Sequence, residues 1–315
     1  RTATRLPDDP EVDVSVGDFV AGRFGASVRE AFVDPLLGGL HSGDVSRLSL
    51  RACTPSLVPA ATTGRSLVLK PGALKQLVGS LTSRRVPACA PAPAPSAGPS
   101  AAPSMMFASF ASGLSRLVDA LAEGSDVRLG TAVTSIERVE EGSASDDARY
   151  RVHLTDVSDL SADAIVLALP APAAADLVRA HAPQTAGRLA DVTLASTATV
   201  VLGYDPAGVA GLPALAGNGI LVPSRHGSTV KAATHLSTKW PHLAPSVGGA
   251  QTGVAPGGSY LVRVSVGRAG SAEIDRLDDE ELLARVRADL QRFVGISAAP
   301  TLAHVQRWRA GLPQL

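Results

Sequence analysis

The side chains that could do acid–base or nucleophilic chemistry are scattered along this sequence. Seven histidines lie between His41 and His304, and no cysteine has a histidine beside it. Cys53 and Cys89 have neither a second thiol nor a histidine at metal-ligand spacing, so neither a zinc site nor a disulfide framework is predicted. The nucleophile elbow, the phosphate-loop lysine motif and the HExxH pattern are all missing. We therefore assign no catalytic residue and no metal ligand, and expect a cofactor to carry the reaction if the chain is an enzyme.

The composition limits the classes of partner that the chain is expected to bind. The 315 residues are 45% apolar, and 29 basic residues balance 29 acidic ones, so nothing draws the chain to nucleic acid or to an anionic membrane surface. Neither a signal peptide nor a transmembrane run is visible, and the sparse cysteines suit a reducing compartment, which predicts a cytoplasmic protein. Because the chain starts at Arg1 and ends in GLPQL, we expect it to be an excerpt of a longer polypeptide.

The elements that must position any site divide into two kinds. Residues 14–34 have helical periodicity after a capping pattern at Ser15 and Asp18, and residues 69–85 continue the helical character. The proline- and alanine-rich stretch 86–104 is expected to be a surface insertion. A helix with an apolar stripe is predicted within 107–123 and strands at 127–140 and 149–155. SADAIVLALP, residues 161–170, is predicted to be a buried strand, followed by a short helix.

From Ala195 onward, strands follow one another with short connections. The segments STATVVLGYD, GILVPS, TVKAATHLS and SYLVRVSVGR predict an antiparallel sheet. A long amphipathic helix with an aspartate cap follows, and the tail TLAHVQRWRAGLPQL is expected to be one more strand. The fold class is therefore α/β, of the α+β kind.

Taken in order, these segments resemble the oxygen-dependent porphyrinogen oxidases of haem synthesis, which are FAD enzymes related to the amine oxidases. The resemblance rests on an ordered series over nearly the whole chain. Its members are SVGDFVAGRFG, FVDPLLGGLHSGDVSRLSLRA, FASFASGLSRLVDAL, VRLGTAVTSIE, ADAIVLALPAPAAADLV, GILVPS, ATHLSTKWPH, LVRVSVGR and RWRAGLPQ. High alanine content, neutral charge and STKWPH look most like the actinobacterial enzymes that act on coproporphyrinogen III.

The resemblance implies a domain plan. Residues 1–104 correspond to a helical domain, 105–180 to the inner part of the Rossmann-like FAD-binding domain, 181–300 to a substrate domain of antiparallel sheet and helices, and 301–315 to a strand returning toward the FAD domain. The glycine-rich turn that holds the FAD pyrophosphate in this family lies outside residues 1–315, so we expect weak or absent FAD binding by this chain alone.

Site residues carry over position by position. Val133 corresponds to the family valine whose main chain meets the adenine, and Trp308 matches the tryptophan near the flavin. Leu221, Thr234 and Val264 correspond to the wall of the tetrapyrrole pocket, although Thr234 departs from the apolar side chain common there. Coproporphyrinogen carries four propionates, so its pocket needs cations at the mouth. Candidates are Lys231, Lys239, Arg263 and Arg268, and a solvated strand face explains each equally well.

The implied activity is oxidation of coproporphyrinogen III to coproporphyrin III by FAD, with O2 as the final acceptor and a haem-pathway enzyme as partner. Three alternatives stay open: a protoporphyrinogen IX oxidase, another flavin amine oxidase or desaturase, and a degenerate tetrapyrrole-binding protein without catalysis.

Overall fold

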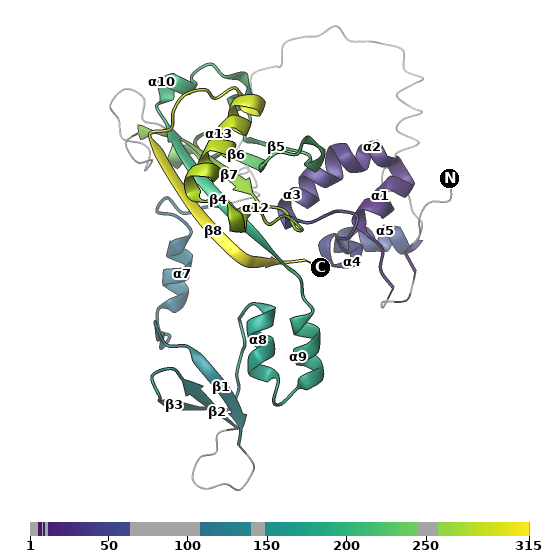
Figure 1. Cartoon of the computed structure of the whole chain (residues 1–315), viewed down its shortest axis with the longest axis vertical. Coiled ribbons are helices and arrows are strands. Elements are labelled where there is room, and N and C mark those ends of the chain that lie inside the picture. Colours follow the sequence, from purple (N-terminus) through teal and green to yellow (C-terminus); the bar gives the residue numbers. More distant parts are fainter. Residues whose placement is uncertain are drawn as a thin grey trace, which may run out of the picture.

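The structure is a computed structural model that describes residues 6, 7, 9, 12–63, 108–139, 149–244 and 258–314. The helix predicted at 69–85 and the insertion predicted at 86–104 lie outside these residues. Figure 1 shows a large sheet with helices beside it, and a smaller sheet at the other end of the molecule. The mixture of helices and antiparallel strands confirms the predicted fold class.

A five-stranded antiparallel sheet forms the larger part, in the order β5-β6-β7-β4-β8. Its strands are β4 (Leu194–Tyr204), β5 (Gly219–Leu221), β6 (Val230–His235), β7 (Tyr260–Val266) and β8 (Leu302–Pro313). Short elements join them: α10 (Pro206–Val209), η3 (Pro213–Ala216), η4 (Ser224–His226), α11 (Leu236–Lys239), η5 (Pro241–Leu243) and α12 (Glu273–Arg276). The strands predicted after Ala195 and their antiparallel pairing are confirmed.

One face of this sheet is buried beneath helix α13 (Asp279–Val294). Asp278 caps the helix by accepting from the Glu281 amide, and the Glu281 side chain accepts from the Asp278 amide in return, as the predicted aspartate cap requires. The helix then turns Leu282, Val286 and Leu290 onto the sheet, where all three are buried. Their spacing places them on one side of the helix, which is why this face forms the main core.

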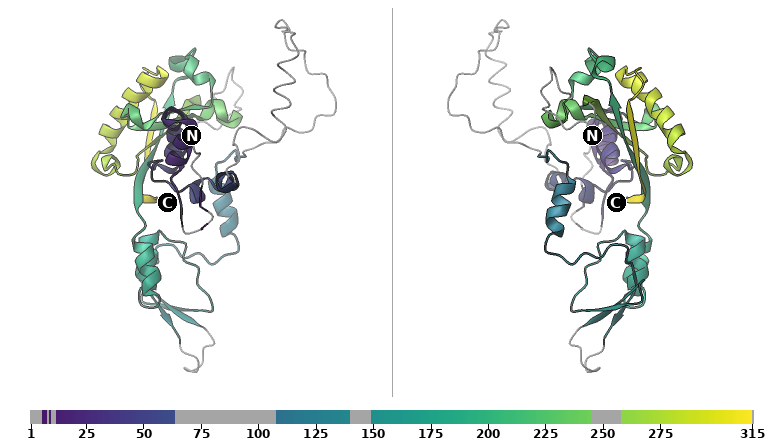
Figure 2. Two further views of the ribbon diagram at one scale, coloured as in Figure 1. Left: turned by 90° about the vertical axis from the view of Figure 1, so that its right-hand side faces the viewer. Right: turned by 90° about the vertical axis from the view of Figure 1, so that its left-hand side faces the viewer.

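The opposite side of the sheet, which we call the open face, follows from strand alternation. Successive side chains of a strand point to opposite sides, and directly paired residues point to the same side. Val264 pairs with Val200 and Ala233, and all three are buried in the core under α13. Arg263, next to Val264 in the chain, therefore points to the open face. Figure 2 shows α13 on one side of the sheet and α1 to α5 on the other.

The amino-terminal residues form a small helical assembly with its own apolar core. It comprises α1 (Val16–Phe24), α2 (Ala26–Val28), the π-helix η1 (Arg29–Gly38), α3 (Gly39–His41), α4 (Leu50–Cys53), η2 (Pro55–Leu57) and α5 (Val58–Thr63). The Ser15 hydroxyl accepts from the Asp18 amide, which confirms the predicted cap. Phe19 and Leu50 are both fully buried in the apolar core of this assembly. Local capping and helical spacing were thus enough to predict where the first helix begins.

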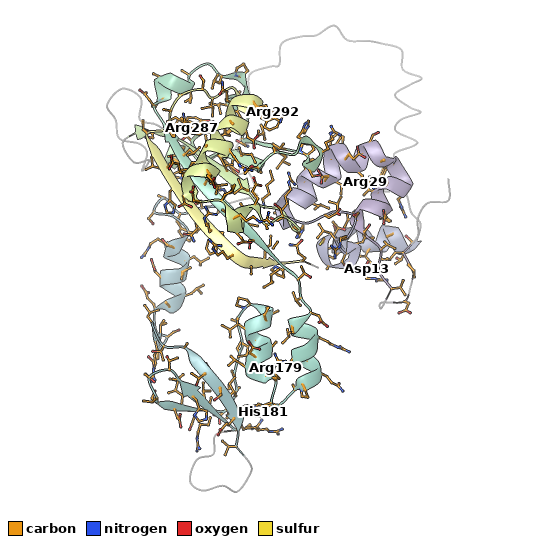
Figure 3. All side chains as sticks on the ribbon, viewed as in Figure 1. Asp13, Arg29, Arg179, His181, Arg287 and Arg292 are labelled. Carbon is orange, nitrogen blue, oxygen red and sulfur yellow. The ribbon has the colours of Figure 1, made fainter. Side chains whose placement is uncertain are left out.

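The smaller sheet has the order β1-β2-β3 and is antiparallel throughout. Its strands are β1 (Val133–Arg138), β2 (Tyr150–Leu154) and β3 (Asp159–Ala162), and α8 (Ala171–Val178) and α9 (Pro183–Ala190) follow. His181, labelled in Figure 3, donates from Nε2 to the Ile136 carbonyl over 2.6 Å. This bond ties the chain after α8 to β1.

One sequence-based expectation of burial is wrong in this structure. The buried strand predicted over residues 161–170 ends with β3 at Ala162, and residues 163–170 are neither strand nor helix. Val166 in this stretch is 90% exposed. An apolar strand needs hydrogen-bonded neighbours, and no described strand runs beside it. Helix α7 (Ser115–Ala122) forms as predicted, but its apolar stripe is exposed rather than packed on a core.

Candidate functional site

An apolar hollow lies between helices α8 and α9 and the ends of β4 and β8. It measures about 600 Å³ and is walled by the segment 167–170, helices α8 and α9, the first residue of β4 and the end of β8. Leu167, Leu169, Leu194 and Pro313 supply much of the apolar wall of this space, which we call the apolar cavity. It therefore lies at the carboxyl end of SADAIVLALP, although that stretch is not a strand.

Trp308 stands beside the apolar cavity. The tryptophan is 55% exposed and pairs with Thr197 across β8 and β4. A Cβ added to Gly311, which lines the cavity, would lie 3.1 Å from the Cβ of Trp308, so the two residues pack closely. The Ala310 amide donates to the Ser196 hydroxyl over 3.0 Å and holds the end of β8 against β4. The exposed Trp308 is thus in close contact with a residue that lines the cavity.

The open face brings together three of the residues that the resemblance singled out. Thr234, Arg263, Val201 and His304 are paired in turn across β6, β7, β4 and β8, and form one straight row. Leu221 begins the next row, opposite Ala232. Trp308 lies on the same face, because it is separated by an even number of positions from His304.

Val264 and Val133 are not part of this group. Val264 is fully buried between the sheet and α13, on the side away from the open face, and so has no surface left for a ligand. The alternation in YLVRVSV carried this signal, because Val262, Val264 and Val266 alternate with Arg263 and Ser265. Val133 begins β1 in the smaller sheet, opposite Leu154, and is 39% exposed.

The four basic candidates occupy different environments. The Lys239 ammonium lies 5.5 Å from the centre of the Trp240 ring, and the Arg268 guanidinium donates to the Val222 carbonyl over 2.8 Å. Arg263 is exposed on the open face. Lys231 is the exception, since only 5% of it is exposed. Sequence reasoning grouped these four as one kind of residue, and the structure separates them.

Lys231 links the sheet to the helical assembly. Its ammonium donates to the hydroxyl of Ser42, which is buried and has a left-handed backbone with φ of 55°. The Ser42 carbonyl in turn accepts from the Ala269 amide over 2.5 Å. Burial, reinforced by the nearby Arg268 cation, lowers the pKa of Lys231 to about 8. The Asp34 carboxylate accepts from the Ser224 amide over 2.6 Å and makes a second polar link to the helical assembly.

The described residues hold no group of three or more histidine, cysteine, aspartate or glutamate side chains arranged to bind a metal ion. None of their helices is both long enough and apolar enough to cross a membrane.

Comparison with known proteins gives these features a context. The chain is 28% identical over 305 residues to the coproporphyrinogen III oxidase of Bacillus subtilis, a match that covers 96% of this chain and 57% of the relative. It is 33% identical over 325 residues to the coproporphyrinogen III oxidase of Propionibacterium freudenreichii, covering 98% and 56%. The chain thus spans little more than half the length of the curated relatives it matches.

Comparison with solved structures agrees with the sequence comparison. A crystal structure from Exiguobacterium sp. 255-15, a provisionally assigned protoporphyrinogen oxidase, matches with a TM-score of 0.67 and 25% identity, covering 100% of this chain and 58% of that one. The resemblance to porphyrinogen oxidases that the sequence indicated is therefore confirmed. The family described as flavin containing amine oxidoreductase matches residues 3–313, and the chain belongs to this family.

Proposed function

We propose that the complete protein is an FAD-dependent coproporphyrinogen III oxidase of haem synthesis, with dioxygen as the final electron acceptor. The observation that carries this proposal is that relatives with this activity in their names match 96% and 98% of the chain. Protoporphyrinogen IX is the alternative substrate, because the Exiguobacterium structure that bears that name matches the whole chain.

The apolar cavity fits the ring system of a flavin. Its volume of about 600 Å³ and its wall of leucine, proline, alanine and valine suit a flat, mostly uncharged heterocycle. Leu169 and Pro313 would contact the ring, and Trp308 would flank it from the rim. The pyrophosphate has no matching anchor here, since residues 1–315 contain no glycine-rich turn opening a helix. This chain would thus supply ring contacts, with the Val133 main chain as the proposed adenine contact.

In the proposed reaction, the flavin supplies a two-electron acceptor for hydrogen that leaves the bridging carbons of the macrocycle. The chain has to bind and orient the macrocycle and keep water from it. Leu221 and Thr234 form the neutral surface on the open face against which the macrocycle would lie. Aromatisation of the product drives the reaction. The described strands of the larger sheet contain no aspartate or glutamate, so this wall offers no carboxylate base.

One experiment distinguishes the four possible functions: a coproporphyrinogen III oxidase, a protoporphyrinogen IX oxidase, another flavin oxidase and a non-catalytic tetrapyrrole-binding protein. The complete open reading frame is expressed, its flavin absorbance is recorded, and porphyrin fluorescence is followed after coproporphyrinogen III or protoporphyrinogen IX is added in air and under nitrogen. We expect a yellow protein that forms coproporphyrin in air well above the rate of a heat-inactivated sample. Faster turnover of protoporphyrinogen IX would favour the alternative substrate. A yellow protein inert to both would indicate another flavin oxidase, and a colourless one that binds porphyrin a non-catalytic protein.

A further inference from the structure

A guanidinium that has no counter-ion among the described residues projects from the open face. Arg263 is exposed, and it has no hydrogen bond or ion pair with any described residue. Its neighbours across the strands, Thr234 and Val201, are uncharged. Arg307, on the α13 side of β8, by contrast donates to the Asp279 carboxylate over 2.7 Å. The two arginines of this sheet therefore differ: Arg307 is paired with a described carboxylate, and Arg263 is not.

The position of Arg263 in the sheet is favourable for a large flat ligand. The row from Thr234 through Arg263 and Val201 to His304 crosses four strands, which makes it roughly 14 Å long at the usual strand spacing. The cation lies in the middle of this row, with the neutral residues Thr234 and Leu221 on one side of it. A ligand whose apolar body covers Leu221 and Thr234 would bring its rim to the guanidinium, and the rim group that pairs best with a guanidinium is a carboxylate.

We propose that Arg263 pairs with a propionate of the tetrapyrrole, at a ring edge where coproporphyrinogen III carries a propionate and protoporphyrinogen IX a vinyl group. This inference rests on the proposed function, and deepens it by naming a residue that sets substrate preference. The planar fork of arginine binds both carboxylate oxygens at once, which a lysine in its place does not reproduce. A vinyl group gives the guanidinium no partner, and covering the cation with it costs binding.

The test compares Arg263→Gln and Arg263→Lys with the wild type in the complete flavin-loaded protein. We expect kcat/KM for coproporphyrinogen III to fall about 10- to 100-fold in Arg263→Gln, the cost of losing one charge-assisted pair. The change should lie mainly in KM, because Arg263 does not contact the reacting carbons. For protoporphyrinogen IX we expect less than about a threefold change. The kcat/KM of Arg263→Lys for coproporphyrinogen III should lie between those of the wild type and Arg263→Gln.

Arg287 offers a matched control. It lies on α13, on the far side of the sheet, and is labelled in Figure 3. Arg287→Gln removes the same charge from the protein, and both porphyrinogens should be oxidised as by the wild type. Equal losses in Arg263→Gln and Arg287→Gln would mean that net charge, and not a pair at position 263, attracts the substrate.

A binding measurement separates this inference from the proposed activity. Coproporphyrin III, the four-carboxylate porphyrin, is titrated into each variant while its fluorescence is followed. If neither porphyrinogen is oxidised but Arg263→Gln binds coproporphyrin III at least tenfold more weakly than the wild type, the activity is refuted and the pairing stands. The pairing is overturned if the wild type binds no coproporphyrin III, if Arg263→Gln binds it equally well, or if the mutation impairs both porphyrinogens equally.

Discussion

At the scale of single residues, Gly267 shows how close packing fixes the junction between β7 and the start of β4. Its backbone has φ of 90°, and a Cβ there would lie 2.6 Å from the Ser196 carbonyl oxygen and 2.9 Å from the Cα of Thr197. The Ser196 hydroxyl also accepts a hydrogen bond from the Ala310 amide, and Thr197 pairs with Trp308 across β4 and β8. Main-chain atoms of β4 and the Ile274 side chain leave no room for a side chain, and any shift of β4 would move the rim of the apolar cavity.

Replacing Gly267 with alanine should therefore destabilise the protein strongly. We expect Gly267→Ala to lower the free energy of unfolding by about 3 kcal/mol or more, measured by urea denaturation. Gly270→Ala is the matched control, because Gly270 has a similar φ of 79° but open space around it. That variant should lose only about 1 kcal/mol, the cost of a left-handed alanine. Equal losses in the two variants would show that close approach at Gly267 is unimportant.

The strands that carry the candidate site residues were predictable from the sequence. The sequence placed Leu221, Thr234 and Trp308 correctly on strands, and the structure puts all three on one face. Val264 was assigned by the resemblance against the alternation of its own strand, and the core under α13 holds it instead. The counter-ion of Arg307 comes from a helix 28 positions away in the chain, so no local pattern could separate Arg307 from Arg263.

At the scale of elements, a buried lysine joins the sheet to the helical assembly. Lys231 leaves β6 at a bulge and donates to Ser42 just after α3. The charged groups around it are Arg268, which disfavours its ammonium, and Asp34, which lies near Arg268. No described carboxylate is paired with the Lys231 ammonium. Packing of β6 against the helical assembly is therefore less favourable while the Lys231 ammonium is charged.

This arrangement predicts an unusual dependence of stability on pH. The pKa of Lys231 is about 8 in the folded protein against an ordinary value of 10.5, so between these values the unfolded chain binds more protons. The free energy of unfolding should therefore rise with pH across this window, by up to about 3 kcal/mol from this group. Denaturant titrations between pH 7.5 and 10.5 should show that the free energy of unfolding rises more with pH in the wild type than in Lys231→Met. Parallel curves would contradict the prediction.

Elements defined by local signals were predictable, and those defined by distant partners were not. Capping residues predicted α1 and α13, and alternation with tight connections predicted the larger sheet. The strand expected at 161–170 depends on neighbours that its own sequence does not specify, and the stripe of α7 depends on a surface to cover it. Both segments show the expected apolar pattern and remain exposed among the described residues.

At the scale of the whole molecule, the apolar cavity lies between α8 and α9, which follow the smaller sheet, and the ends of two strands of the larger sheet. Leu169 and helices α8 and α9 come from the side of the smaller sheet, while Leu194, Gly311 and Pro313 come from the ends of β4 and β8. Figure 1 shows β4 and β8 running side by side from the larger sheet toward α8 and α9. A group held in this cavity would thus contact both parts at once, and its binding should stabilise their arrangement.

An acidic group in the cavity should therefore displace flavin without preventing folding. Leu169 lines the cavity and is 47% exposed, so Leu169→Asp should fold, yet burying its carboxylate beneath a bound ring would cost several kcal/mol. We expect the complete protein carrying Leu169→Asp to bind flavin at least about 100-fold more weakly, measured by the flavin-to-protein absorbance ratio after dialysis. Val157→Asp makes the same change in an exposed turn between β2 and β3 and should retain flavin. Full flavin content in Leu169→Asp, with far-UV circular dichroism unchanged, would place the ring outside the apolar cavity.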